Sequence, residues 1–357
     1  MKVKLGDLTK IKTGKLDANA SSEDGQYPFF TCSREPLKIS NYSYDCECVL
    51  VAGNGDLNVK YYNGKFDAYQ RTYIIEDNSG GQLYMPYLYY FMEGYIKELR
   101  RQAIGGVIKY IKLGNLTDAL IELPSVDAQK KIVNILKKAK QLLSLSNNEI
   151  LKLDELVNAR FVEMFGNPVA NDRGWNTLPL ENACKSIVDC PHSTPSYTNE
   201  DTGFMCIRTS IVKKNKIFWD DIEYIPEDEF VKRIQRKKPE VGDIVYTREG
   251  AILGIAAIID RDCNVALGQR SMLLSPDIDK CTSEFVCVAM NSDSFLDNVL
   301  KGVSGSASPH INVGDIKAFR MIMPPVELQK QFSDFVKQVD KSKLYKISTL
   351  QFPCIPG

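Results

Sequence analysis

The sequence predicts a mixed α/β (α+β) fold. It consists of two similar globular domains with twisted mixed β-sheets, related by a pseudo-two-fold internal repeat and joined by long antiparallel coiled-coil helices. Three observations predict this fold. The stretch Leu123–Lys130 returns two hundred positions later as Met323–Lys330. Short apolar runs that end in glycine-containing turns precede both copies, as expected of buried strands. An apolar pattern of helical period follows each copy.

The repeat covers more of the chain than this one pair of segments. Four further pairs match: Val3–Leu8 with Trp175–Asn182, Val49–Gly55 with Asp243–Gly250, Gln70–Ile75 with Gln269–Leu274, and Tyr110–Leu116 with His310–Ile316. Between these anchors the halves differ in length and content, so the scaffold repeats while the intervening surface varies. The predicted parts are a first globular domain (1–124), a helix (125–167), a linker (168–174), a second globular domain (175–324), a shorter helix (325–351) and a tail (352–357).

The helix after each copy carries an a/d seam of apolar residues. The seam comprises Ile132, Leu136, Leu143, Ile150, Leu153 and Val157 with the flanking Phe161 in the first helix, and Phe332, Val336 and Val339 in the second. A helix over 127–165 would be roughly 58 Å long, although Asn147-Asn148 leaves two shorter helices open. The second helix fades after Val339 and ends about 15 residues earlier, because Pro353 and Pro356 cannot continue a helix. The two helices either pair as a spacer between the domains or pack each on its own domain.

Composition places the chain among ordinary globular proteins. Its 357 residues suffice for two or three domains, and 44% hydrophobic with 25% charged residues excludes disordered and fibrous classes. No apolar run approaches the roughly 18 residues of a membrane span, and the N-terminus lacks the apolar core of a signal peptide. We therefore expect a cytoplasmic protein, whose ten cysteines are reduced and often buried.

Residue patterns of catalysis are missing. The sequence contains no GxGxxG or GxxxxGK[ST] phosphate-binding motif and no Asn/Asp-Pro-Pro-Tyr/Phe run for methyl transfer to an amine. It has only two histidines. A zinc site from Cys46, Cys48, Cys184, Cys190 and His192 fits no CxxC pairing, so buried thiols are the better interpretation and no metal is expected. A divergent Asp/Glu/Lys nuclease site stays open, but nothing points to one.

Several polar side chains are candidates for binding DNA. A basic run before a strand, Lys232–Lys238, could neutralise phosphates, although taken by itself the run slightly favours a solvated helix face. Matching Gln-Arg pairs before apolar strands could read bases or serve structure. Other candidates lie on predicted turns and matched loops. The candidate contacts are Lys60, Gln70, Arg71, Lys109, His192, Arg233, Arg236, Lys237, Lys238, Arg248, Gln269, Arg270 and His310.

The paired helix openings and the end of the first helix, Phe161–Pro168, resemble a known family. Over nearly its whole length the chain is similar to the specificity subunit of type I restriction-modification systems. The resemblance implies two target-recognition domains, each reading half of a bipartite site in double-stranded DNA, with the helices as spacer. It also implies that the chain performs no chemistry and binds no cofactor. Modification subunits would use S-adenosylmethionine to methylate adenine, and restriction subunits would use ATP and Mg²⁺ to translocate and cut DNA.

Two alternatives remain at this point. The chain could be a stand-alone methyltransferase or nuclease fusion, or a structural repeat protein that binds protein partners. One departure from the family is the short second helix. It leads us to expect that the segment around Leu153–Met164 of the first helix lacks part of its intramolecular cover, and that a modification subunit or a second copy of the chain covers it.

Overall fold

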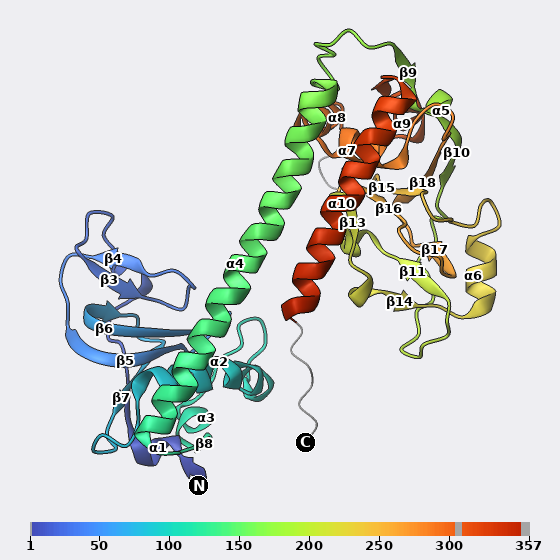
Figure 1. The fold of residues 1–357 in the computed structure, drawn as a ribbon. Helices are drawn as coiled ribbons and strands as arrows, with labels where there is room; N and C mark the ends of the chain where they lie inside the picture. Colours follow the sequence, from blue (N-terminus) through green and yellow to red (C-terminus); the bar gives the residue numbers. More distant parts are fainter. Residues whose placement is uncertain (1, 304–308, 351–357) are drawn as a thin grey trace. The chain divides into compact units, whose positions relative to one another are not determined.

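The computed structural model describes residues 2–303 and 309–350 (Figure 1). It divides into two compact units, Met1–Leu145 (unit 1) and Ser146–Gly357 (unit 2). The predicted tail 352–357 and the predicted loop residues 305–308 lie outside the described residues. Among the described helices, none is long and apolar enough to cross a membrane.

A mixed sheet forms the centre of unit 1. Within residues 2–145 its six strands run in the order β2 (Thr9–Thr13), β7 (Thr72–Asp77), β5 (Tyr44–Ala52), β6 (Val59–Ala68), β3 (Tyr27–Phe30) and β4 (Leu37–Ile39). All neighbours are antiparallel except β3 and β6. Alternate residues of β5 face opposite sides: Val49 and Val51 join a core with Leu88 and Met92 of helix α2 (Met85–Gln102), whereas Leu50 faces the aromatic core on the other side.

Unit 2 is built from smaller sheets. Among its described strands, one sheet has the order β10 (Cys184–Asp189), β18 (Ser271–Pro276), β15 (Ile244–Thr247) and β16 (Ala256–Ile258). A second sheet has the order β14 (Glu223–Tyr224), β11 (Met205–Ile207) and β17 (Val265–Leu267). Strands β12 (Val212–Lys213) and β13 (Lys216–Ile217) form a hairpin. Strands β11 and β17 are parallel. The helices packed around them are α6 (Glu227–Arg233), α7 (Ser283–Asn291) and α8 (Asp293–Lys301), with single 3₁₀ turns at Thr209–Ile211 and Trp219–Asp221. Unit 1 has one such turn, Ala18–Ala20.

The internal repeat is confirmed by elements that recur in the same order. In unit 1, β1 (Lys2–Lys4) pairs antiparallel with β8 (Leu120–Glu122), and α1 (Leu5–Leu8) contacts α3 (Leu113–Thr117). In unit 2, β9 (Thr177–Pro179) pairs antiparallel with β19 (Arg320–Ile322), and α5 (Leu180–Ala183) contacts α9 (Val313–Ala318). Each last strand leads through a proline into a long helix. The mixed α/β class predicted from the sequence is therefore correct.

The long helices are α4 (Val126–Phe165), with 40 residues, and α10 (Val326–Leu350), with 25 (Figure 1). Helix α4 is about 60 Å long at 1.5 Å per residue. It runs without interruption through Asn147 and Asn148, which rules out two shorter helices. Because the units divide between Leu145 and Ser146, α4 belongs to both of them.

Within unit 2 the end of α4 packs antiparallel on α10. Phe161 meets Phe332 edge-on with ring centroids 5.5 Å apart, and further along Lys343 pairs with Asp154 at 2.6 Å and Lys346 pairs with Glu149. Phe161 also stacks on Phe285 of α7. Both arrangements that the sequence left open, pairing with each other and packing on the domain, therefore occur in unit 2.

The expectation that Leu153–Met164 lacks part of its cover is wrong for the seam residues, although Leu156 and Val162 in this segment are exposed. Leu153 and Met164 pack against the core of unit 2, and Val157 and Phe161 are buried in it. An antiparallel pair places the beginning of α10 against the end of α4, and this is the part of α4 that belongs to unit 2. The seam residues divide accordingly. Exposed are Ile132, Leu136 and Leu143; half-buried are Ile150 and Leu153; buried are Val157, Phe161, Phe332, Val336 and Val339.

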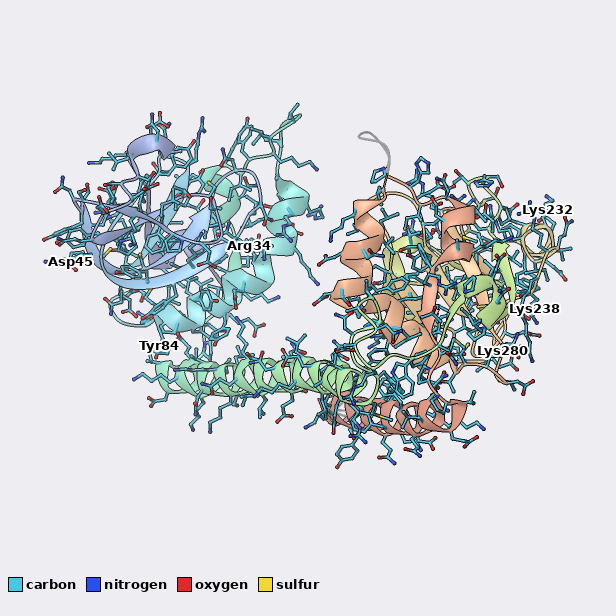
Figure 2. The ribbon with its side chains drawn as sticks, turned by 90° about the horizontal axis from the view of Figure 1, so that it is seen from above. Arg34, Asp45, Tyr84, Lys232, Lys238 and Lys280 are labelled. Carbon is cyan, nitrogen blue, oxygen red and sulfur yellow. The ribbon has the colours of Figure 1, made fainter. Side chains whose placement is uncertain are left out.

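A glutamine clamps the first turn of each long helix to its unit. Gln129 is fully buried; its amide oxygen accepts from Tyr84 N at 2.8 Å, and its amide nitrogen donates to the carbonyls of Gln82 and Pro124. Gln329 is equally buried and makes the matching three bonds to Thr282 N, Lys280 O and Pro324 O. Tyr84 and Lys280 lie beside these helices in Figure 2. The repeated sequence therefore encodes a repeated anchor.

Candidate nucleic-acid interface

Three segments that are far apart in the sequence meet at one edge of unit 1. Gly53 N donates to Arg71 O (2.8 Å), Ile111 N donates to Gly53 O (2.9 Å), and Gly55 N donates to Lys109 O (3.0 Å). A Cβ atom on Gly53 would lie 2.4 Å from Arg71 O, so glycine is required for this close approach. We call residues 53–55, 70–71 and 109–111 loop frame 1.

Unit 2 contains the same frame. Arg248 N donates to Arg270 O (3.0 Å), Ile311 N donates to Arg248 O (2.9 Å), and Gly250 N donates to Pro309 O (3.1 Å). Gly55 and Gly250 both have positive φ, +67° and +89°. We call residues 248–250, 269–270 and 309–311 loop frame 2. Each of these three bonds thus has its counterpart in the other unit, which confirms that the matched sequence anchors occupy equivalent positions.

The Gln-Arg pair differs in exposure between the two frames. In frame 1, Gln70, Arg71 and Lys109 are exposed on turns and loops. In frame 2, Arg270 is exposed and adopts φ +70°, a left-handed conformation that costs an L-residue about 1–2 kcal/mol. Gln269 is half-buried, and its amide oxygen is buried without a hydrogen-bond partner. The glutamine of the Gln-Arg pair is therefore exposed in frame 1 and half-buried in frame 2.

Arg248 holds frame 2 in place. Its side chain is only 6% exposed, donates two hydrogen bonds to the Asp189 carboxylate at 2.9 and 3.2 Å, and pairs with Glu249 at 2.7 Å. Asp189 also pairs with the exposed His192 through Nε2 at 3.1 Å, and its carbonyl accepts from Arg236 at 3.1 Å. The predicted contact Arg248 is therefore a buried support, whereas His192 and Arg236 lie exposed beside it. His310 is half-buried and pairs with Glu249 as an isolated β-bridge.

The basic run at the end of α6 divides in the same way. The Arg233 side chain is 1% exposed and binds Glu229, Leu267 O and Ser193 O, which closes the loop that follows β10. Lys237 is mostly covered between Glu240 and Asp243. Lys232 and Lys238 extend from the surface of unit 2 (Figure 2). The segment is therefore neither a continuous phosphate-binding surface nor a fully solvated helix face, because Arg233 and Lys237 are covered while Lys232 and Lys238 are exposed.

Lys60 of frame 1's neighbouring strand is half-buried. It donates to the side chain of Asn58, and burial lowers the pKa of its ammonium group. No sequence pattern pointed to the arginines nearby: Arg34 and Arg100 both pair with Asp56, at 3.1 and 3.0 Å. The Arg34 guanidinium beside Asp56 lowers the pKa of that carboxyl. Charge pairs that only the fold assembles thus add cations next to frame 1.

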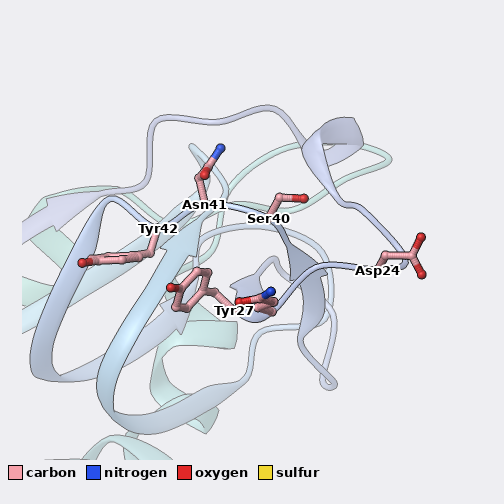
Figure 3. Close-up of a pocket in the computed structure, with 6 residues that line it drawn as sticks. Asp24, Tyr27, Ser40, Asn41 and Tyr42 are labelled. Atoms are coloured by element: carbon pink, nitrogen blue, oxygen red, sulfur yellow. The ribbon is translucent and has the colours of Figure 1, made fainter.

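A shallow polar pocket of about 290 Å³ lies on the β3–β4 side of unit 1 (Figure 3). Asp24, Gln26, Ser40 and Asn41 line it together with Tyr27 and Tyr42, whose rings lie 4.9 Å apart. The sequence did not single out this pocket, because its residues follow no motif and come together only in the hairpin.

No group of three or more His, Cys, Asp and Glu side chains is placed to hold a metal ion in residues 2–303 and 309–350. All nine cysteines in those ranges are free, and Cys48, Cys184 and Cys190 are buried. Burial raises the pKa of the Cys184 thiol to about 12. These thiols therefore behave as packed apolar groups in the described structure.

Comparison with known proteins gives the same family for both halves. The model of the type I restriction modification DNA specificity domain matches residues 1–155 and 174–350. The EcoDI specificity subunit of a type I restriction enzyme from Escherichia coli is 29% identical, over 94% of this chain and 80% of its own length. The MjaVIII specificity subunit from Methanocaldococcus jannaschii is 22% identical, over 95% and 85%. The crystal structure of the S subunit of a type I restriction-modification system from M. genitalium superposes with a TM-score of 0.55 at 15% identity, over 98% of this chain and 91% of that one.

Proposed function

The chain belongs to the type I restriction-modification DNA specificity family, and from this membership we propose that it selects the DNA sequence on which a type I complex acts. Unit 1 reads one part of a bipartite site in double-stranded DNA and unit 2 reads the other. The observation that carries the proposal is the loop frame. The same backbone hydrogen bonds and the same Gln-Arg pair recur in both units, while the surrounding residues differ: Gly53, Asn54 and Lys109 in frame 1 correspond to Arg248, Glu249 and Pro309 in frame 2.

The exposed frame residues suit direct readout. An arginine guanidinium matches the acceptors of guanine in the major groove, and a glutamine amide matches adenine. We assign base contacts to the exposed Gln70 and Arg71 in unit 1 and to the exposed Arg270 in unit 2, whereas Gln269, whose amide oxygen is buried, supports its frame. The exposed cations near the frames would bind phosphates: Lys109 in unit 1, and His192 when protonated, Arg236 and Lys238 in unit 2. Lys60 and His310 support the edges of the frames, while Arg233, Lys237 and Arg248 hold the loops.

The chemistry belongs to partner subunits in this proposal. The chain binds no cofactor of its own; modification subunits use S-adenosylmethionine to methylate adenine, and restriction subunits use ATP and Mg²⁺. The complex works in the cytoplasm, where its DNA lies. Helices α4 and α10 serve assembly, and α4, which belongs to both units, sets the gap between the two half-sites.

Methylation mapping tests the proposal. The chain is expressed with its modification subunits in a host without other adenine methylation, and methylated adenines are mapped across the genome. We expect one bipartite motif with an unread gap. Arg71→Ala should relax only one half of the motif and Arg270→Ala only the other. Lys10→Ala, in β2 opposite Glu76, and Arg261→Ala remove exposed cations that belong to neither frame and are the matched controls.

A contiguous motif, or a motif that neither frame variant changes, would contradict the proposal. A second measurement is the salt dependence of duplex binding by the assembled complex. Because phosphate contacts release counterions, the logarithm of the binding constant should fall steeply with the logarithm of salt concentration. The loss of Lys109 should reduce this slope by about 1 without changing the motif.

A further inference from the structure

Loop 105–109 of unit 1 presents bare aliphatic side chains to solvent. Val107 is 103% exposed and Ile108 is 63% exposed, and Ile104 and Tyr110 at the base of the loop are also exposed. Water contact of large apolar side chains is costly, and a contiguous apolar patch on a surface commonly marks an interaction site. Two neighbouring aliphatic residues at a loop tip, with no intramolecular contact to cover them, therefore call for a ligand.

The tip is held in position and belongs to loop frame 1. Backbone bonds in both directions between Ile104 and Tyr110 (3.0 and 2.8 Å) close the loop as a hairpin. Gly105 has φ +118°, and a Cβ there would lie 2.6 Å from Ile108 O, so the turn requires glycine. Lys109 O accepts from Gly55 N at 3.0 Å. The aliphatic tip is thus hydrogen-bonded through Lys109 to Gly55, in the same turn as Gly53, which binds Arg71 O.

We propose that Val107 and Ile108 form an apolar wedge that enters the DNA duplex at the half-site read by unit 1 and partly unstacks one base step. This inference rests on the proposed function, and deepens it by stating how that half-site is read. Insertion of aliphatic side chains between base steps is a known means of bending and probing DNA. Its cost depends on how easily the step unstacks, so the wedge makes recognition depend on the deformability of a step that no polar group needs to contact.

Charge around the tip favours DNA over a protein partner. Lys109 on the loop and Arg71 on the adjacent turn are exposed cations, and the neighbouring Asp56 is paired with both Arg34 and Arg100. An apolar tip beside exposed cations suits a ligand with apolar stacked bases inside two rows of phosphates. A partner surface on another protein would need a matching acidic rim around an apolar hollow.

The wedge distinguishes the two halves. The corresponding stretch of the second half reads Ser304-Gly305-Ser306-Ala307-Ser308-Pro309 and holds no large aliphatic residue. Residues 304–308 lie outside the described residues, so this contrast is one of sequence. Modification subunits flip the adenines that they methylate out of the stack. Apart from these adenines, base unstacking by the wedge should occur in one half-site only, the half that Arg71→Ala relaxes.

The test uses the assembled complex of the chain with its modification subunits, and a duplex that carries the motif found by methylation mapping. 2-Aminopurine, whose fluorescence rises when it unstacks, replaces one base at a time across each half-site. The test variant is Val107→Ser with Ile108→Ser. The control is Ile278→Ser, an equally exposed aliphatic residue (65%) in unit 2. A conservative exchange, Val107→Ile with Ile108→Val, keeps an apolar tip.

We expect a several-fold rise in fluorescence at one step of the unit 1 half-site for the wild type, the Ile278→Ser control and the conservative exchange. The double serine variant should show no rise, and its Kd should increase about 10- to 100-fold. The salt slope should stay unchanged, because no charge is removed. Both side chains are exposed, so the variant should retain its unfolding midpoint, which urea titration checks.

Three results would overturn the wedge. One is wild-type binding without unstacking at any step apart from the methylated adenines. A second is unchanged affinity and unstacking in the double serine variant. The third is loss of modification subunits from that variant without DNA, seen by light scattering, which would make the tip a protein contact. All three leave the bipartite motif intact. Failure of the proposed function would appear earlier and separately, as the lack of a bipartite methylation motif in wild-type cells.

Discussion

Replacing Gln329 by leucine should destabilise unit 2 strongly, although leucine is a better helix former and similar in size. Gln329 is fully buried where α10 begins. Its amide binds Thr282 N at 3.1 Å, Lys280 O at 3.2 Å and Pro324 O at 2.8 Å. Leucine would fill the space but leave these three backbone groups without a partner.

The magnitude follows from the number of groups left unpaired. A buried polar group that loses its partner costs about 1–3 kcal/mol. Three such groups cost about 3–9 kcal/mol if water reaches none of them, and the buried leucine methyls return about 1–2 kcal/mol. We expect a net loss of about 1–8 kcal/mol in the free energy of unfolding, a large share of the roughly 5–15 kcal/mol that stabilises a typical domain.

Urea unfolding followed by tryptophan fluorescence measures this loss. The chain has two tryptophans, Trp175 and Trp219, and both belong to unit 2. Trp175 donates to Phe165 O at the end of α4, so its environment reports on the helix pair. Gln331→Leu makes the same chemical change two residues later, at an exposed position of α10. The reasoning is refuted if the two variants unfold within about 0.5 kcal/mol of each other.

Three further predictions concern frame 2, α4 and a buried thiol. Arg270→Gly should raise the free energy of unfolding by about 1 kcal/mol, because glycine adopts φ +70° without strain, and yet weaken duplex binding; parallel urea and binding titrations check it, and equal or improved binding would count against base contact by Arg270. Seven residues of helix inserted after Leu142, in the exposed part of α4, should shift the preferred half-site gap by about two to three base pairs, because they add about 10 Å. Methylation mapping checks that prediction, and changed half-sites with an unchanged gap would contradict it. Burial raises the pKa of the Cys206 thiol to about 12, so alkylation at pH 8 should label Cys206 slowly until urea unfolds the chain. Peptide mass spectrometry measures this rate, and fast labelling of the native protein would show that Cys206 is accessible.

The backbone of the site could be predicted from the sequence. The matched segments around Gly55 and Gly250 share a left-handed glycine, and the Gln-Arg pairs and loop ends that bond to them were matched by the same repeat. Such positions are set by local backbone geometry, which requires particular residues at particular places. A repeat therefore preserves them even where the rest of the surface has diverged.

The roles of the charged side chains could not be predicted in the same way. Arg233 and Lys238 belong to one basic run, but Arg233 turns inward to Glu229 while Lys238 extends outward. A count of charges along a segment does not contain this difference, because it depends on which carboxylates and carbonyls the fold brings near. Arg248 is similar: its partner Asp189 lies 59 residues earlier in the chain.

The cover of α4 is a different case, because the sequence held enough information to place it correctly. The predicted helices were antiparallel and began at equivalent points, so the beginning of α10 had to lie near the end of α4. Phe332 accordingly packs against Phe161 and Phe165. A short second helix can then only leave the earlier part of α4, from Ile132 to Leu143, without a counterpart among the described residues.

The construction of the frames bears on how specificity can change without loss of the fold. Each frame is closed by bonds between backbone atoms, so most frame side chains are free to vary. A Cβ on Gly53 would collide with Arg71 O, and the φ of +67° at Gly55 favours glycine although a Cβ there would meet no atom within 4 Å. In frame 2 the residue equivalent to Gly53 is Arg248, which is tied to Asp189. Changes at this inner position need a compensating partner, whereas changes at Gln70, Arg71 and Lys109 need none. New DNA specificities should therefore arise first at these outer positions.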